Sequence, residues 1–312
     1  MTARCEPRAF PSRSRSLGRA LLGGLVMATA LGAGTAVGSV LTKAAGLDGV
    51  PARLVSAALV SAIATPLVLL AARRARLPAR LLGTGGPRAM FRAFLAGSGV
   101  MAAAAALVMG AATAAGLLRW SAPDLVTLAG FLVTNGVVAL LLEAWPEEVT
   151  LRGYTWAALR ERFSGLCAGL ATTVVFLLVP GASTVVRAVV GRALGEDEVP
   201  SLGLAPPGQS TADYLILLAV FGTALVVART AVPGPAPLGA AIGAHLVFLT
   251  VNRVVFDGEA RGAGWSAELS SPDAALLVPA YLLVAVAGFR LYRRVRPPVP
   301  ARRYDCPGTL GP

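Results

Sequence analysis

Two adjacent glutamates, Glu147 and Glu148, follow a long apolar segment of the 312-residue sequence. They stand in the stretch PEEVTLRG, and Arg152 comes four residues after Glu148. Only 14% of the residues are charged, against about 25% in an ordinary soluble domain. Carboxylates beside an apolar span carry a free-energy cost, so their presence needs an explanation. A carboxylate in such a place can act as a general base that activates water for hydrolysis.

The residues around the pair predict how it is held. Pro146 is expected to end the preceding helix and to begin a new one, so that the glutamates lie in its first turn. Glu148 and Arg152 can pair there across one helical turn. Glu143 lies four residues before Glu147 and brings a third carboxylate near if the helix is only kinked. A solvated polar face at the end of a membrane helix is the alternative interpretation.

The only histidine in the chain, His245, lies inside the apolar run LGAAIGAHLVFLTVNRVVF. An ionisable residue within a membrane is a functional-site hypothesis by default; the alternative is a neutral histidine that hydrogen-bonds a neighbouring helix. Asn252 follows two helical turns later on the same face. A carboxylate pair, a histidine and an amide that face one cavity open to the cytoplasm would form a hydrolytic site. His245 or Asn252 would then stabilise the oxyanion.

Other chemistries find little support in the sequence. A zinc site needs three or four ligands, whereas the chain offers one histidine and three widely spaced cysteines, Cys5, Cys167 and Cys306. A Ser-His-Asp triad would lack its G-x-S-x-G motif, and the glycine patterns of nucleotide-binding loops are absent. We therefore expect neither a metal nor a cofactor.

The elements that must position these residues are membrane helices. The sequence is 55% apolar with a mean hydropathy of +0.69, and apolar runs of roughly 18 residues or more predict transmembrane helices. Eight such spans are expected, at about residues 20–42, 54–72, 93–118, 125–143, 165–186, 214–228, 238–256 and 274–289. The predicted fold is an all-α, polytopic helical membrane bundle with a polar cavity between its fourth, fifth and seventh spans.

The basic residues predict the orientation of this bundle. The segments on one side of the eight spans hold 21 lysines and arginines, and those on the other side hold six. By the positive-inside rule, both termini and the Glu147/Glu148 stretch face the cytoplasm, as expected of a multi-pass protein of the inner cell membrane. The net charge of +12 then favours contact of the basic loops with anionic lipid headgroups rather than with nucleic acid.

The chain divides into five segments on this basis. Residues 1–19 form a basic cytoplasmic tail, 20–118 contain the N-terminal transmembrane helices, and 119–256 form a membrane core that carries the motifs. Residues 257–289 contain the last outer loop and transmembrane helix, and 290–312 form a second basic cytoplasmic tail.

The sequence EEVTLRG, at 147–153, resembles the first motif of the CPBP family, the CAAX-protease and bacteriocin-processing intramembrane endopeptidases. That motif has two glutamates, three further residues and an arginine, usually followed by glycine. The second motif of the family has a histidine four residues after a phenylalanine; here Phe176 is followed by Pro180. The third has an asparagine or similar residue four positions after a histidine. His245 fits this place, but Leu249 stands four residues on. The resemblance covers about residues 125–256.

This resemblance implies an intramembrane glutamic-type endopeptidase that hydrolyses a membrane-associated protein or peptide near the cytoplasmic face. It assigns Glu147 or Glu148 as the base, Arg152 as a positioning residue and His245 as the partner of the oxyanion or of water. Phe176 supports the site, and Asn252 is a possible replacement for the third-motif amide. Two alternatives stay open: a non-catalytic relative that binds a protein or peptide, and a small-molecule transporter. The sequence assigns neither the substrate nor the oligomeric state.

Overall fold

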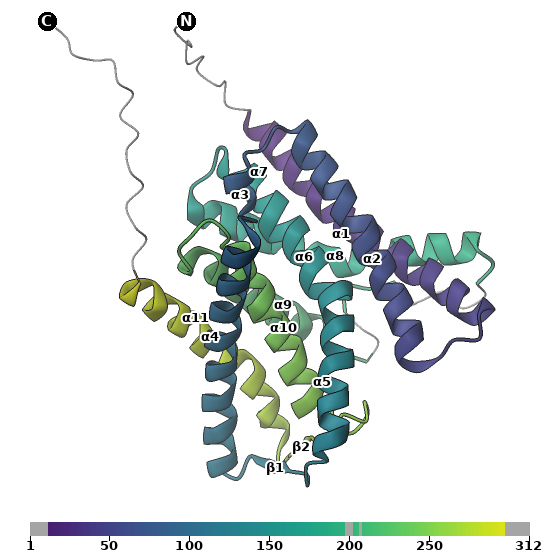
Figure 1. Ribbon diagram of the computed structural model, residues 1–312, viewed down its shortest axis with the longest axis vertical. Coiled ribbons are helices and arrows are strands. Elements are labelled where there is room, and N and C mark those ends of the chain that lie inside the picture. The colour runs from purple at the N-terminus through teal and green to yellow at the C-terminus, as the bar shows by residue number, and fades with distance from the viewer. Residues whose placement is uncertain (1–11, 197–201, 206–207, 297–312) are drawn as a thin grey trace, which may run out of the picture.

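The computed structural model describes residues 12–196, 202–205 and 208–296, and these form a bundle of long helices (Figure 1). Eight of the described helices are long and apolar enough to cross a membrane. The predicted helical membrane bundle of about eight spans is therefore confirmed, and the protein is a multi-pass membrane protein. Both predicted basic tails lie largely outside the described residues.

The elements in chain order are α1 (Arg13–Ala44), α2 (Gly49–Arg74), α3 (Ala79–Leu82), α4 (Pro87–Ala114), β1 (Leu118–Trp120), α5 (Leu125–Ala139), η1 (Leu140–Ala144), α6 (Trp145–Glu147), η2 (Glu148–Thr155), α7 (Trp156–Arg160), α8 (Gly165–Ala193), α9 (Thr211–Ala231), α10 (Leu238–Val255), β2 (Ala267–Leu269), η3 (Pro272–Leu276) and α11 (Leu277–Val295).

The fourth span differs from its prediction. Residues Leu125–Arg160 form one continuous helical stretch, and Pro146 does not break it. Pro146 stands in the first turn of the short α6, between the π-helical segments η1 and η2. A π-helical turn changes the hydrogen-bonding register, which lets the stretch accommodate the missing proline N–H without ending. Glu147 and Glu148 consequently lie in the helix interior and not in the first turn of a new helix.

A short β-ladder joins two connections at one end of the bundle. The third predicted span was placed too far along the chain, because Gly116 turns the chain at φ +73° and Leu118 begins β1. Strand β1 pairs antiparallel with β2, and Leu118 lies opposite Leu269. Trp120 stacks on Trp265 with ring centroids 4.4 Å apart. The ladder therefore ties the connection before α5 to the one after α10.

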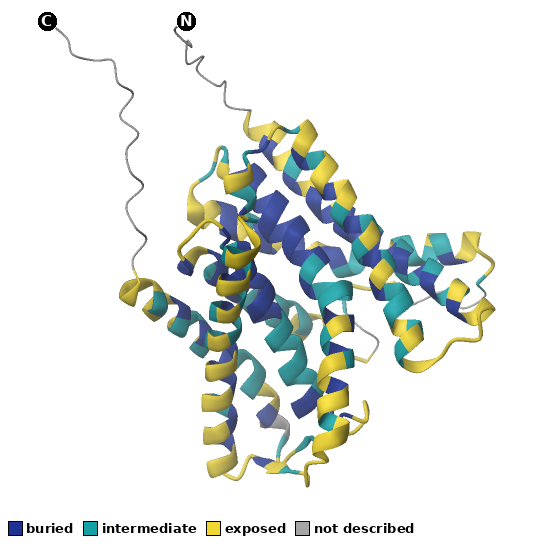
Figure 2. Ribbon diagram, in the orientation of Figure 1, coloured by how far each residue is buried: buried dark blue, intermediate teal, exposed yellow. Residues whose placement is uncertain are grey.

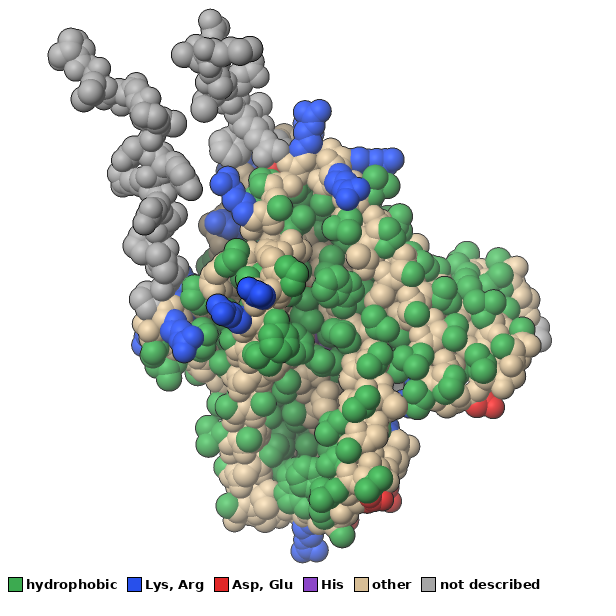
Figure 3. Space-filling model, in the orientation of Figure 1, with side chains coloured by type: hydrophobic (Ala, Val, Ile, Leu, Met, Phe, Trp, Pro, Cys, Tyr) green, Lys and Arg blue, Asp and Glu red, His purple; other side chains and the backbone are tan. Residues whose placement is uncertain are grey.

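The helices pack in two groups around a buried centre. Helix α1 packs along α8 and α2, and these three reach to one side of the molecule, whereas α4 packs along α10 and α11. Figure 2 shows buried residues concentrated where η2, α9 and α10 meet and exposed residues along the outer faces of α4 and α5. On the face drawn in Figure 3, apolar side chains cover the middle and basic side chains gather at the end near α1 and α3. This distribution matches a bundle whose flanks contact lipid.

Glycine lets α4 and α10 approach closely. A Cβ atom at Gly97 would overlap the carbonyl oxygen of Ala240, and one at Gly243 would overlap that of Phe94. Small residues at such crossings allow the helix backbones to pack against each other in lipid. Helix α10, which carries His245, is thereby fixed against α4.

We predict that Gly97→Ala lowers the stability of the protein by about 2 kcal/mol, because overpacking a tight helix crossing forces backbone shifts. The measurement is the thermal unfolding midpoint of the purified full-length protein in detergent. Gly99→Ala and Gly110→Ala are matched controls on α4, because a Cβ there meets nothing within 4 Å. An unchanged midpoint for Gly97→Ala would show that α4 and α10 are not closely packed.

Candidate active site

A fully buried ion cluster joins η2 to α10. The Oε1 atom of Glu148 accepts a hydrogen bond from Arg152 Nη1 at 3.1 Å and lies 2.9 Å from His245 Nδ1. The Glu148 and Arg152 side chains have no exposed surface, and that of His245 is 2% exposed. The structure therefore brings together three of the residues that the sequence singles out. Their contact lies far from solvent, where an unpaired charge would be costly.

The Arg152 guanidinium makes two further contacts. Its Nη2 donates to the Gly222 carbonyl of α9 at 3.5 Å, and its Cζ lies 4.5 Å from the ring centroid of Phe176 on α8. A guanidinium over an aromatic face gains cation–π attraction, more so when both groups are desolvated. Arg152 therefore links η2 to α8 and α9, and Phe176 contributes to this through its ring.

An aromatic wall lies beside the histidine. The Phe221 ring packs edge-on against His245 at 4.9 Å and against Phe176 at 6.1 Å, and it stacks on Phe248 at 3.9 Å. These contacts hold the imidazole plane while its Nδ1 faces Glu148. Phe221 could not be identified from the sequence, because an apolar residue inside an apolar span carries no distinguishing signal.

A cavity of about 590 Å³ lies on the other side of the histidine. Glu143, Glu147 and His245 line it among mostly apolar residues, which include Phe176, Pro180 and Phe221. Glu148 is not among the lining residues. The two adjacent glutamates therefore have different surroundings: Glu147 faces the cavity, and Glu148 lies behind it in the ion cluster. A carboxylate and an imidazole that line the same cavity can transfer protons to and from a bound molecule.

The cavity borders the connection between α8 and α9 through Gly203, Leu204 and Ala205. The basic residues of the sequence assign this connection to the outer side, whereas the cavity was expected to open to the cytoplasm. The helix also continues for twelve residues beyond Glu148 to Arg160, or about 18 Å at 1.5 Å per residue. The glutamates consequently lie deep in the bundle rather than at a helix end.

The third carboxylate, Glu143, has its own cationic partner. Arg253 Nη2 donates to Glu143 Oε1, and Arg253 Nη1 donates to Asn135 Oδ1 at 3.2 Å. Arg253 stands inside the seventh predicted span, where a charged residue calls for a partner on another helix. That rule could have suggested the pair with Glu143 from the sequence; nothing in the sequence pointed to Asn135.

The amide expected beside the histidine lies elsewhere. Asn252 Nδ2 donates to the carbonyl oxygen of Phe248 and, at 2.6 Å, to the hydroxyl oxygen of Tyr281 on α11. Asn252 does not line the cavity, and the expectation that it shares the cavity with His245 is wrong. Seven residues along a helix correspond to about 10 Å of rise, which is too far for one amide to reach the same ligand atom.

No group of three or more His, Cys, Asp and Glu side chains that could hold a metal ion occurs among the residues that the structure describes. The titratable groups at the cavity are thus two carboxylates and one imidazole. This set can accept and donate protons and can stabilise a developing charge by hydrogen bonding.

We predict that Arg152→Met destabilises the protein by about 3 kcal/mol, because it removes a cationic partner from the buried Glu148 carboxylate. Adding Glu148→Gln removes the orphaned charge and should restore a large part of this loss. The measurement is thermal unfolding of the three full-length proteins. The control is Arg261→Met, since Arg261 pairs with Asp257 at the same 3.1 Å and the same spacing but near the surface; its loss should cost less than about 1 kcal/mol. A double variant no more stable than Arg152→Met would contradict the prediction.

The comparison with known proteins agrees with the motif that carries the buried cluster. Residues 128–251 match the family model described as type II CAAX prenyl endopeptidase Rce1-like. The matched range contains Glu147, Glu148, Arg152, Phe176 and His245. No curated protein and no solved structure matches the chain. The resemblance drawn from EEVTLRG is confirmed: residues 128–251 are similar to the Rce1-like model of the CPBP family.

Proposed function

We propose that this protein is an intramembrane glutamic-type endopeptidase that hydrolyses a peptide bond of a membrane-associated protein or peptide. The observation that carries the proposal is the cavity in which Glu147 and His245 both take part, with His245 held from behind by Glu148. The match of residues 128–251 to a family of prenyl endopeptidases supports the same reaction class.

The proposed reaction begins with water in the cavity. Glu147 takes a proton from this water, and the hydroxide attacks the carbonyl carbon of the scissile peptide bond. His245 Nδ1 is directed to Glu148, so Nε2 is the ring nitrogen that can donate to the oxyanion of the tetrahedral intermediate. When the C–N bond breaks, Glu147 returns its proton to the leaving amine. The products are a carboxylate and an amine.

Three further residues hold this arrangement in place. The Glu148 carboxylate lies 2.9 Å from His245 Nδ1 and orients the imidazole ring. Arg152 limits the movement of Glu148, and Phe176 covers the guanidinium. We assign all three as positioning residues, because the cavity is lined by Glu147 and His245 rather than by Glu148 or Arg152.

The proposed setting is the inner cell membrane with both termini in the cytoplasm. The excess of basic residues on one side of the spans supports this orientation. It also favours contact of the basic loops with anionic lipid headgroups. The mostly apolar cavity wall suits an extended segment of a membrane-associated chain.

A non-catalytic relative that binds a protein or peptide is the second candidate. Two observations favour it. Pro180 lines the cavity with a side chain that neither donates nor accepts a proton, and the Asn252 amide donates its hydrogen bond to the Tyr281 hydroxyl. A binding protein would need the cavity but not the second and third motifs. No contact in the described residues favours the transporter alternative over these two.

The reaction can be tested on the full-length protein reconstituted in lipid vesicles. We expect it to cleave a peptide that ends in a CAAX sequence, offered in prenylated and unmodified forms to show whether the lipid is required. Glu147→Gln should lower the rate at least about 100-fold, because an amide cannot take the proton of the attacking water. Glu259→Gln, an exposed carboxylate change outside the cavity, should leave the rate unchanged.

The two candidate functions give different results in this assay. Cleavage that depends on Glu147 and His245 supports the endopeptidase. Saturable peptide binding without cleavage, at the same affinity in Glu147→Gln, supports the binding protein and contradicts the proposed reaction.

A second prediction concerns the second motif. Pro180→His should raise the cleavage rate by about tenfold or more, since an imidazole at the cavity wall adds a proton carrier. Pro180→Ala is the control for removing a proline from the interior of α8. If the histidine variant is no faster than the alanine variant, a second imidazole at this position has no role in the reaction.

A further inference from the structure

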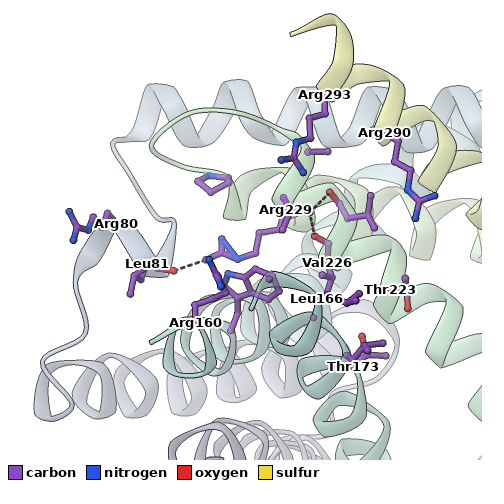
Figure 4. A pocket seen from close by; sticks show the side chains of 18 residues that line it. Arg80, Leu81, Arg160, Leu166, Thr173, Thr223, Val226, Arg229, Arg290 and Arg293 are labelled. Carbon is purple, nitrogen blue, oxygen red and sulfur yellow. Dashed lines mark hydrogen bonds between the residues drawn. The ribbon is translucent and has the colours of Figure 1, made fainter. Parts of the chain in front are cut away.

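A second cavity lies at the end of the bundle where α7, α8, α9 and α11 meet, and it is strongly basic. Its volume is about 690 Å³. It shares no lining residue with the cavity at His245. None of its lining residues is acidic, and five are arginines: Arg80, Arg160, Arg229, Arg290 and Arg293. Figure 4 shows Arg229 in the centre with the other four around it.

Arg229 is a buried cation that forms no direct ion pair with any residue that the structure describes. Its exposed fraction is 4%. Nη2 donates to the carbonyl oxygen of Leu81 at 2.6 Å, and Cζ lies 5.6 Å from the ring centroid of Trp156. Nε has no hydrogen-bond partner among the described residues. Burying a guanidinium with only one neutral acceptor is costly, so an anion is the partner that this site lacks.

Other arginines in the interior have carboxylate partners that Arg229 lacks. Arg152 lies against a carboxylate of its own helix at 3.1 Å, and the largely buried Arg253 also contacts a glutamate. None of the five cavity arginines forms an ion pair with any residue that the structure describes; Arg160 Nη1 donates only to the Phe163 carbonyl oxygen, at 2.6 Å. Arg152 and Arg253 thus have carboxylate partners within the protein, whereas the five cavity arginines are available to an external anion.

One wall of the cavity is apolar and open. Leu166 and Leu170 stand one turn apart on α8 and are 74% and 58% exposed. Val226 and Val227 of α9 continue this surface. Exposed leucines beside a cluster of arginines fit a ligand that carries an anionic group and a hydrocarbon chain together.

We propose that this cavity binds one anionic phospholipid. Its phosphate lies among Arg229, Arg290 and Arg293, and an acyl chain follows Leu166 and Leu170 along α8. Arginine suits this role because its guanidinium donates two parallel hydrogen bonds to phosphate oxygens. The cavity is at the arginine-rich end of the bundle, on the side proposed to face the cytoplasm, where anionic lipids concentrate.

A soluble phosphate-bearing ligand would use the same arginines. The exposed leucines favour a phospholipid over a soluble phosphate. A free phosphate gains no binding energy from an apolar wall, whereas a lipid buries part of its acyl chain there. We therefore assign the lipid as the occupant and use inorganic phosphate as the competitor in the test.

The test is native mass spectrometry of the purified full-length protein titrated with dioleoylphosphatidylglycerol or dioleoylphosphatidylcholine. Arg290→Gln/Arg293→Gln changes two exposed cavity arginines without altering a buried residue. Arg88→Gln/Arg92→Gln is the matched control, since it removes the same charge from exposed positions of α4 outside the cavity. Leu166→Asn/Leu170→Asn tests the apolar wall.

We expect one phosphatidylglycerol to bind at least about tenfold more tightly than phosphatidylcholine. Arg290→Gln/Arg293→Gln should abolish this preference, Leu166→Asn/Leu170→Asn should weaken binding of both lipids, and the α4 control should behave as the unmodified protein. Equal losses in both arginine pairs would overturn the proposal in favour of general surface charge. Displacement of the lipid by millimolar inorganic phosphate would overturn it in favour of a soluble anion, and an absent preference for phosphatidylglycerol would overturn it outright.

Discussion

The buried carboxylate of Glu148 sets the arrangement of the surrounding helices. Its Oε1 contacts only Arg152 and His245 among the described residues, and its Oε2 has no partner there. Because a buried charge is stable only with close partners, η2 and α10 must stay in contact. Gly97 of α4 allows α10 to approach, and Gly222 of α9 accepts from Arg152. Four elements, η2, α8, α9 and α10, therefore meet at one ion cluster, and the cavity lined by Glu147 and His245 lies beside it.

Neighbouring positions on a helix point in different directions, and this separates the two glutamates. Glu147 and Glu148 are adjacent in sequence, yet one lines a cavity and the other is enclosed by an arginine and a histidine. The π-helical register of η1 and η2 carries the chain through Pro146 at this point. Interruptions of this kind are frequent at functional sites, because they change which side chains face inward.

Length and hydropathy were sufficient to predict the eight spans, since a membrane-crossing helix needs a long apolar run. The spacing of Glu148 and Arg152 likewise predicted their pairing. Three features depended on tertiary structure. The passage of the helix through Pro146 follows from packing rather than local propensity. Asn252 turns to Tyr281 because α11 offers a hydroxyl there. Phe221 joins the site only because α9 lies between α8 and α10. A motif can specify residue types, but the facing helices decide which of them meet.

The β1–β2 ladder has a mechanical consequence for the bundle. It fastens the start of α5 to the segment after α10, and the Asp124 N–H also donates to the Gly264 carbonyl oxygen at 2.7 Å. Glu147 lies on the stretch Leu125–Arg160, and His245 lies on α10. The ladder therefore restrains the two helices that carry these residues from moving apart. The connection between α8 and α9 has no such strand pairing among its described residues, and these two helices are held by side-chain packing and by their contacts with Arg152. The cavity therefore has one side braced by backbone pairing at the end of the bundle and another side held by side chains alone.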